Sequence, residues 1–256
     1  MRISATVITF NEEDNIAAAL ESLAWADEII VVDSESKDRT VEIARRFTDR
    51  IYVRAWPGYS AQKNFASEQA SFDWIFSLDA DERVSDALAK ELQALTHGPE
   101  PTCAAFEMPR LTFYLGRWIK HSGWYPDHKP RLYNRKLARW AGEFVHESLE
   151  VNGPIERLSG DILHYTVRDA SDHHQRIDRY TTLAAQELFQ KGRRATHLSM
   201  FISPASAFLR AYVLKRGFLD GAQGLAIARF AAHYVFLRNL KLWEMSATPS
   251  NKDRIE

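Results

Sequence analysis

Residues 74–82 read WIFSLDADE, and this stretch decides how the chain is interpreted. Its apolar first part, 74–78, predicts a strand that is buried on both faces. Asp79 and Asp81 follow directly at the carboxyl end of that strand, where parallel α/β sheets bind their ligands. Two carboxylates separated by one residue can share a hard divalent cation. The alternative is a solvated turn that leads into a helix capped by Ser85.

Three more strand candidates precede this stretch, and they alternate with helical patterns. The strands are expected at 3–10, 28–32 and 50–55, and the helices at 13–25, 41–47, 60–70 and 85–95. Parallel neighbours in a sheet need crossover helices, so the alternation predicts an α/β fold with a doubly wound, mainly parallel sheet. Further strands are expected at 104–108, 131–133 and 162–167, and a helical C-terminal extension begins with a long helix at 170–190.

Composition and length limit the class of protein. The 256 residues suit one large domain, or one domain with an appendage. With 33 Lys and Arg against 34 Asp and Glu, nothing in the overall charge indicates a nucleic-acid partner. The single cysteine, Cys103, cannot form an intramolecular disulfide, and the N-terminus does not resemble a signal peptide. We therefore expect a cytoplasmic protein.

The turn after the first strand excludes two familiar phosphate sites. It lacks the glycines of a dinucleotide-binding loop and of a Walker loop, and its residues 11–14, NEED, would repel phosphate. A diphosphate bound at this edge would have to be neutralised by a metal ion.

Four motifs in the first hundred residues resemble, in sequence and order, those of family 2 glycosyltransferases with the GT-A fold. They are TFNE at 9–12, VVDSESKDRT at 31–40, QKN at 62–64 and SLDADE at 77–82. The resemblance implies an inverting glycosyltransferase that uses a nucleotide-sugar donor, usually a UDP-sugar, and Mg or Mn.

The resemblance also assigns roles to residues at the strand ends. Lys63 would approach the base or the diphosphate, and Asp81 would be the principal metal ligand. Asp79, with Ala80 beside it, would bind the ribose or the metal. The nucleotide base would be held by Thr9, Phe10, Asn11, Glu12 and Asp33. The alternatives are that Asp33 and Asp38 cap helical segments and that Lys63 is an ordinary surface lysine.

Residues 121–133 combine aromatic and basic side chains in a predicted loop. Aromatic faces suit sugar rings and Arg suits phosphate, so we predict that Trp124, Tyr125 and Arg131 bind the acceptor. Core packing is the alternative for Trp124 and Tyr133.

Residues 140–147, WAGEFVHE, supply candidates for the catalytic base. An inverting transfer needs a carboxylate that removes a proton from the acceptor hydroxyl. Glu147 is the first choice and Glu143 the second, because a Val-His-Glu segment at this place resembles one in bacterial lipopolysaccharide-core transferases. His146 would complete the metal shell or contact the diphosphate, or would be a structural histidine.

The C-terminal part is basic and aromatic. Residues 204–244 carry six Lys or Arg against two carboxylates and are expected to form a helical pair interrupted at 217–221. Such a pair could lie in the headgroup region of an anionic membrane, or pack on the catalytic domain or another subunit. Its sequence also resembles the tails of the lipopolysaccharide-core group.

The predicted organisation is therefore a catalytic domain at 1–168, with a nucleotide-sugar half at 1–100 and an acceptor half at 101–168, followed by a helical region at 169–256. The expected acceptor is a lipid-linked or cell-surface glycan such as lipopolysaccharide core, reached at the inner face of the cytoplasmic membrane. One alternative is a non-catalytic module of the same fold that binds a nucleotide-sugar or a membrane. Another is a nucleotidyltransferase, which would need a glycine-rich basic loop that the first turn lacks.

Overall fold

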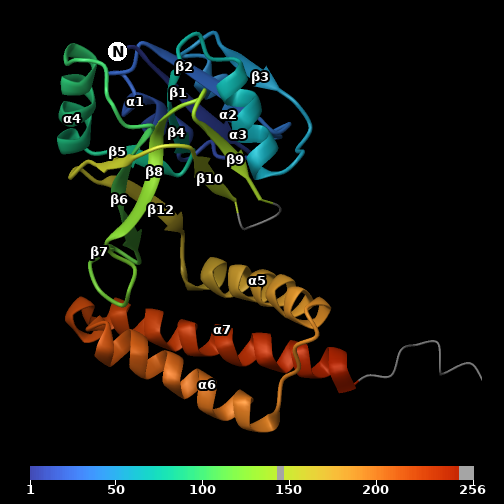
Figure 1. The fold of residues 1–256 in the computed structure, drawn as a ribbon. Coiled ribbons are helices and arrows are strands. Elements are labelled where there is room, and N and C mark those ends of the chain that lie inside the picture. The colour runs from blue at the N-terminus through green and yellow to red at the C-terminus, as the bar shows by residue number, and fades with distance from the viewer. Residues whose placement is uncertain (143–146, 248–256) are drawn as a thin grey trace, which may run out of the picture. The chain divides into compact units, whose positions relative to one another are not determined.

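The computed structural model describes residues 1–142 and 147–247. The chain forms two compact units, which are described separately (Figure 1). The first unit comprises Met1–Leu111 and Pro126–Thr166, and the second comprises Thr112–Tyr125 and Val167–Glu256.

The first unit begins with four parallel strands and the helices that connect them. The strands are β1 (Ile3–Thr9), β2 (Glu28–Asp33), β3 (Ile51–Val53) and β4 (Trp74–Asp79), and the helices are α1 (Ile16–Glu21), α2 (Thr40–Ala44), α3 (Tyr59–Glu68) and α4 (Asp86–His97). The strands lie in the order β3-β2-β1-β4, which confirms the predicted doubly wound arrangement. In register, Thr9 lies opposite Asp33 and Ile8 opposite Asp79, so the three strand ends are neighbours at one edge.

The rest of the sheet is mixed. Strand β8 (Asp127–Asn134) runs antiparallel to β4, and β6 (Ala105–Tyr114) runs antiparallel to β8. The order continues through β12 (Ile162–Val167) to β5 (Glu82–Val84), while β11 (Ile155–Arg157) pairs with β6. A separate antiparallel pair is formed by β9 (Ala138–Ala141) and β10 (Ser148–Val151). Three of these strands were expected from the sequence, whereas β5, β9, β10 and β11 were not.

Alternate side chains of β4 face two different hydrophobic clusters. Phe76 and Leu78 belong to a cluster that includes Leu20 of α1, and Ile75 belongs to a cluster that includes Ala66 of α3. The parallel strands are therefore covered by helices on both faces, as their continuous apolar sequences require. Each fully buried Ile, Leu or Phe contributes roughly 1.5–3 kcal/mol of transfer free energy.

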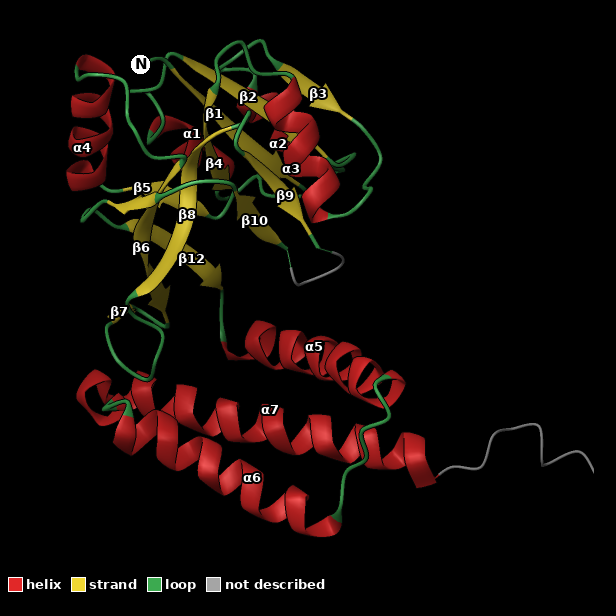
Figure 2. Cartoon of the chain, viewed as in Figure 1, coloured by secondary structure: helices red, strands yellow, loops and turns green. Residues whose placement is uncertain are grey.

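The second unit is mainly helical. Strand β7 (Arg117–Ile119) pairs with the last residues of β6, and three long helices follow: α5 (Ala170–Gln190), α6 (His197–Leu209) and α7 (Gly221–Ala247). Within this unit α7 lies between α5 and α6 (Figure 2). A π-helical turn (Arg210–Leu214) and a short 3-10 helix (Gly217–Asp220) connect α6 to α7, so the break predicted at 217–221 is confirmed. No helix in the described ranges is long and apolar enough to cross a membrane.

Helix α6 begins seven residues before the position that the sequence suggested. Thr196 and Ser199 form a capping box, in which each side chain accepts a hydrogen bond from the other residue's backbone N–H. This cap satisfies N–H groups that a helix start leaves without partners. Pro204 consequently lies inside the helix rather than at its start.

Candidate active site

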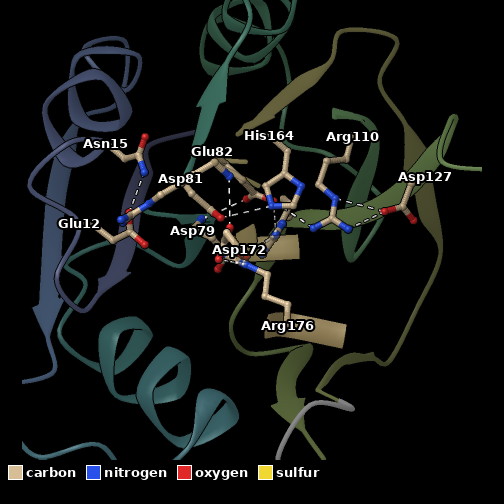
Figure 3. A network of polar contacts seen from close by, with 12 residues as sticks. Glu12, Asn15, Asp79, Asp81, Glu82, Arg110, Asp127, His164, Asp172 and Arg176 are labelled. Atoms are coloured by element: carbon tan, nitrogen blue, oxygen red, sulfur yellow. Dashed lines mark hydrogen bonds and ion pairs between the residues drawn. The ribbon is translucent and has the colours of Figure 1, made fainter. Parts of the chain in front are cut away.

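Asp79 lies at the carboxyl end of β4, close to Asp81 and Glu82 (Figure 3), and it forms ion pairs with two basic residues. Its Oδ2 atom is 2.7 Å from a guanidinium nitrogen of Arg131, and its Oδ1 atom is 3.0 Å from the Nζ atom of Lys63. Burial by itself would raise the pKa of the Asp79 carboxyl. The charges of Arg131 and Lys63 outweigh that effect and hold the pKa well below its usual range. Asp79 is therefore an ionised hydrogen-bond acceptor at neutral pH.

Arg131 lies within strand β8, as the strand predicted at 131–133 requires, although the sequence also suggested a loop for residues 121–133, and its side chain is only 5% exposed. One of its terminal nitrogens lies 2.7 Å from Asp79 and 2.7 Å from Glu82. Glu82 is fully buried, accepts the backbone N–H of Asp79 and lies 3.4 Å from Arg110. Arg131 thus holds the turn at 79–82 in place, and a contact with the acceptor stays a prediction.

Lys63 is buried, so the alternative of an ordinary surface lysine is wrong. Its Nζ atom lies 3.2 Å from the Oε1 atom of Glu147 and 4.4 Å from the centre of the Trp140 ring. Aromatic faces attract a cation in this position. Lys63 therefore joins Asp79, at the end of the parallel sheet, to Glu147, the first candidate for the base.

The other two residues of the QKN motif place α3 against its neighbours. The side-chain amide of Gln62 donates to the Oγ atom of Ser34 at 3.1 Å. The side chain of Asn64 donates to the carbonyl of Trp140 and accepts from the N–H of the same residue. The motif thus links the end of β2, the charged centre and strand β9 through three consecutive side chains.

A chain of hydroxyl groups supports the Trp140 ring. The indole N–H donates to the Tyr133 hydroxyl at 2.9 Å, and that hydroxyl lies 2.7 Å from the Oγ atom of Ser67. Burial raises the pKa of Tyr133 to about 12, so the phenol stays protonated and can donate to Ser67. Tyr133 and Trp140 both belong to the hydrophobic core, as the packing alternative for Tyr133 proposed.

The turn after β1 is bonded to the loop after β2. Asn11 has a φ of 51°, its N–H donates to Ser36 Oγ at 2.8 Å, and its side-chain oxygen accepts from the N–H of Lys37. The N–H of Glu12 donates to Thr40 Oγ1 at 2.8 Å. These bonds hold the TFNE and VVDSESKDRT motifs together as one wall of the site.

Asp33 and Thr9 face each other at the ends of β2 and β1. The Asp33 carboxylate is buried and accepts the N–H of Ser36 at 2.9 Å, which closes the turn after β2. The Thr9 hydroxyl is buried and has no hydrogen-bond partner within the described chain, whereas Phe10 is 55% exposed. The predicted contacts of these residues with a nucleotide base stay predictions.

Asp81 lies beside a residue that the sequence did not single out. Its Oδ2 atom is 3.4 Å from the Nε2 atom of His164 on β12 (Figure 3). The backbone carbonyl of Asp81 accepts a hydrogen bond from the N–H of Tyr165. The Nδ1 atom of His164 is buried and has no partner in the described part of the chain. A histidine between apolar residues of a predicted strand was the available signal, but the partner strand β5 was not recognised.

Asp81 and His164 form a donor set that fits a divalent cation. No group of three or more acidic, His or Cys side chains that could hold a metal occurs among residues 1–142 and 147–247. Mg²⁺ does not need one, because it is usually held by one or two carboxylates together with substrate phosphates and water. When bound, such an ion would neutralise phosphate charge at this edge of the sheet.

Five further site residues were predicted from the sequence. Glu143 and His146 fall outside the described residues. Ala80 has its side chain in the hydrophobic core, so only its backbone could contact a ligand. Trp124 and Tyr125 belong to the second unit, where the Trp124 ring packs edge to face against Tyr114 at 5.4 Å.

Comparisons with known proteins agree with this architecture. A solved mannosyltransferase from Pyrobaculum calidifontis, in complex with GDP-Man and Mn²⁺, is 16% identical and superposes with a TM-score of 0.54 over 95% of this chain and 87% of its own. The similarity shows that the fold is of the GT-A class.

Sequence comparisons show the family. Residues 4–149 match the model described as glycosyl transferase family 2. An uncharacterized glycosyltransferase of Rickettsia prowazekii is 32% identical over 98% of this chain and 89% of its own length. The lipopolysaccharide core biosynthesis glycosyltransferase LpsC of Rhizobium meliloti is 29% identical over 96% of this chain and 93% of its own. The chain belongs to glycosyl transferase family 2.

Proposed function

We propose that the protein transfers a sugar, with inversion, from a UDP-sugar to a lipid-linked or cell-surface glycan such as lipopolysaccharide core. The observation that carries the proposal is the position of Lys63, whose ammonium group lies within 3.2 Å of both Asp79 and Glu147. A donor-side carboxylate and a candidate base are thereby held on either side of one cation. The similarity to LpsC, which is named for lipopolysaccharide core biosynthesis, supports the acceptor class.

Within this proposal the donor is held by the strand ends. The wall formed by residues 9–12 and 33–40 contacts the base, and Asp79 accepts hydrogen bonds from the ribose. Asp81 and His164 hold Mg or Mn, and the solved protein of the same fold that contains GDP-Man also contains Mn²⁺. An ion held there would stabilise the negative charge that develops on the departing nucleoside diphosphate.

Glu147 removes the proton from the acceptor hydroxyl. A general base must lie within hydrogen-bond reach of that proton, so the acceptor hydroxyl must approach the Glu147 carboxylate. Lys63 keeps this carboxylate oriented, and the charge of Lys63 is shared with Asp79. The transfer takes place at the cytoplasmic face of the membrane that carries the acceptor.

Release of nucleoside diphosphate tests the proposal. The full chain is incubated with a panel of UDP- and GDP-sugars, with and without lipopolysaccharide-core oligosaccharide, in Mn²⁺ and then in excess chelator. We expect release from a UDP-sugar that the acceptor accelerates, that chelator abolishes and that added Mn²⁺ restores. Undiminished activity in chelator would remove the metal from the proposal. Donor binding by calorimetry without any turnover would support the non-catalytic binding module instead.

A further inference from the structure

The segment that surrounds α6 has an unusual distribution of charge. Residues 188–219 contain six Lys or Arg and not one Asp or Glu. The thirteen residues of α6 itself, HLSMFISPASAFL, contain no Lys, Arg, Asp or Glu. The basic residues bracket the helix: Lys191, Arg193 and Arg194 precede it, and Arg210, Lys215 and Arg216 follow it.

The apolar side chains of α6 and of the turn after it are exposed. None of the residues of α6 is buried, and Phe201 is 79% exposed. Leu198 and Ile202 are 66% and 57% exposed, and Leu214 in the π-helical turn is 75% exposed. Leu198, Phe201 and Ile202 are spaced three and four residues apart and therefore share one face of the helix, and an exposed apolar face rimmed by polar groups indicates a protein or membrane contact. We call these four side chains and the six bracketing basic residues the α6 surface.

An apolar groove of the second unit adjoins Phe201. It has a volume of about 530 Å³ and is lined by Met200, Phe201 and Pro204 of α6 and by Phe230 and Phe236 of α7, among others. The two helices are joined beside it by a hydrogen bond of 3.1 Å from the Asn239 side chain to the carbonyl of Ser199. The groove offers apolar walls to a hydrocarbon chain at the α6 surface.

The length of α6 shows whether this helix could cross a membrane or could only lie on its surface. A helix of thirteen residues is roughly 20 Å long, whereas the hydrocarbon core of a bilayer is about 30 Å thick. The helix is too short to cross, and its basic residues stand at both ends. Apolar side chains beside Lys and Arg are typical of helices that lie in the interface of anionic membranes.

We propose that the α6 surface docks on an anionic lipid bilayer, with α6 parallel to the membrane plane. Phe201, Ile202 and Leu214 enter the boundary between headgroups and acyl chains, and the bracketing Lys and Arg side chains contact lipid phosphates. The groove between α6 and α7 receives the end of an acyl chain. This inference goes beyond the proposed function, because binding to a bilayer requires no sugar transfer.

Co-sedimentation of the full chain with vesicles tests the inference. Vesicles of phosphatidylcholine alone are compared with vesicles that also contain phosphatidylglycerol, at low and at high salt. We expect binding to the anionic vesicles that salt weakens, since headgroup attraction is screened within a Debye length. Equal binding to both kinds of vesicle, or binding to neither, would overturn the proposal.

Two double variants, each with a control, test whether the α6 surface is the part of the protein that binds the vesicles. Phe201→Ser with Ile202→Ser should weaken partitioning by roughly a hundredfold or more, because each apolar side chain contributes roughly 1.5–3 kcal/mol when it is buried. The control is Val53→Ser, which removes a 56% exposed apolar side chain from the first unit. Arg193→Gln with Arg194→Gln should weaken binding roughly thirtyfold, at about 1 kcal/mol for each charge near the surface. Its control is Arg46→Gln with Arg157→Gln, which removes two exposed cations of the first unit.

Circular dichroism and sedimentation velocity complete the test. The variants must retain the wild-type far-UV spectrum, so that lost binding reports the surface rather than unfolding. If the wild type is a dimer without lipid and Phe201→Ser with Ile202→Ser makes it a monomer, then a second copy covers the α6 surface and the proposal is wrong. Unchanged vesicle binding by both double variants would contradict it as well.

Discussion

The Nζ atom of Lys63 lies 3.2 Å from the Oε1 atom of Glu147, although 84 residues separate them in the sequence. Its side chain is 2% exposed, and the Glu147 side chain is 22% exposed. The same ammonium group pairs with Asp79 at 3.0 Å. If this buried cation were removed or replaced by a neutral group, the carboxylates of Asp79 and Glu147 would lose their ion-pair partner. Lys63 is therefore required for the structure of the site.

Lys63→Met should destabilise the first unit. Removal of one member of a buried ion pair typically costs about 3–5 kcal/mol, and we expect about 3 kcal/mol because Glu147 can turn toward solvent. The control is Lys136→Met, whose ammonium group is 2.7 Å from Asp73 but whose side chain is 69% exposed. Exposed pairs contribute less than about 1 kcal/mol. Urea unfolding of both variants measures the difference, and equal midpoints would contradict the buried role of Lys63.

The four parallel strands and their helices could be predicted because local patterns specify them. The apolar run of β4, for example, is long enough to indicate burial on both faces without knowledge of its neighbours. Strands β5 and β11 have three residues each and carry no period of their own. They are strands only because β12 and β6 supply their hydrogen bonds, which no local pattern reveals.

In the candidate site, too, some residues could be predicted from the sequence and others could not. Asp79, Asp81 and Lys63 could be singled out because they stand in motifs at strand ends. The partners of these residues could not, since the register between distant strands brings Arg131 to Glu82 and His164 to Asp81. A buried cation looks like any other lysine or arginine in the sequence, so the strand at Arg131 could be predicted but its burial against Asp79 and Glu82 could not.

Glu147→Gln should abolish transfer while preserving donor binding. A positioned general base contributes typically 10²–10⁴-fold to the rate, so we expect a loss of about that size in kcat. Glu150→Gln, three residues along the same segment and exposed, is the matched control and should retain full activity. Turnover with an acceptor oligosaccharide gives kcat, and calorimetry gives donor affinity. If the Glu147→Gln enzyme had the wild-type kcat, another residue would be the catalytic base, and Glu143 is the next candidate.

His164→Gln should weaken the affinity for Mn²⁺ rather than the affinity for the donor's base. The His164 imidazole is next to Asp81, and loss of a group that holds or orients a metal ligand typically costs about 10–100-fold in metal affinity. Titration of activity with Mn²⁺ should therefore shift to higher concentration, and activity should recover at saturating metal. Recovery separates a lost ligand from a misfolded site. The control is His97→Gln, which removes an exposed histidine at the end of α4.

Gly224→Ala should destabilise the second unit. An added Cβ at this position would lie 1.8 Å from the carbonyl oxygen of Gly217, so the 3-10 helix before α7 would have to move. Overpacking of this kind typically costs about 1–3 kcal/mol. Gly98→Ala is the control, because its Cβ would meet its nearest atom at an ordinary 3.4 Å. Thermal unfolding with vesicle binding as a second readout should show a loss for the first variant alone.

The second unit should also lose stability in mild acid. Burial lowers the pKa of His173, with Arg176 adding to the effect and Asp172 opposing it. Burial and the neighbouring His174 lower the pKa of His233. A histidine whose folded-state pKa lies below the unfolded value of about 6.5 binds fewer protons when folded. Its contribution is complete above about pH 6.5 and is lost as the pH falls through the folded pKa values.

Hydrogen exchange resolved by peptide can locate this effect. Protection of α5 and α7 should fall between about pH 6.5 and 5.5, after correction for intrinsic exchange, because both histidines lie in these helices. Protection of α3 should hold over the same range, since the ion pairs keep the pKa of Asp79 far below it. His233→Gln should reduce the pH dependence of α7, and His97→Gln should leave it unchanged. Equal loss of protection in both units would show that acid acts on the whole chain and not through the partly buried histidines of the second unit.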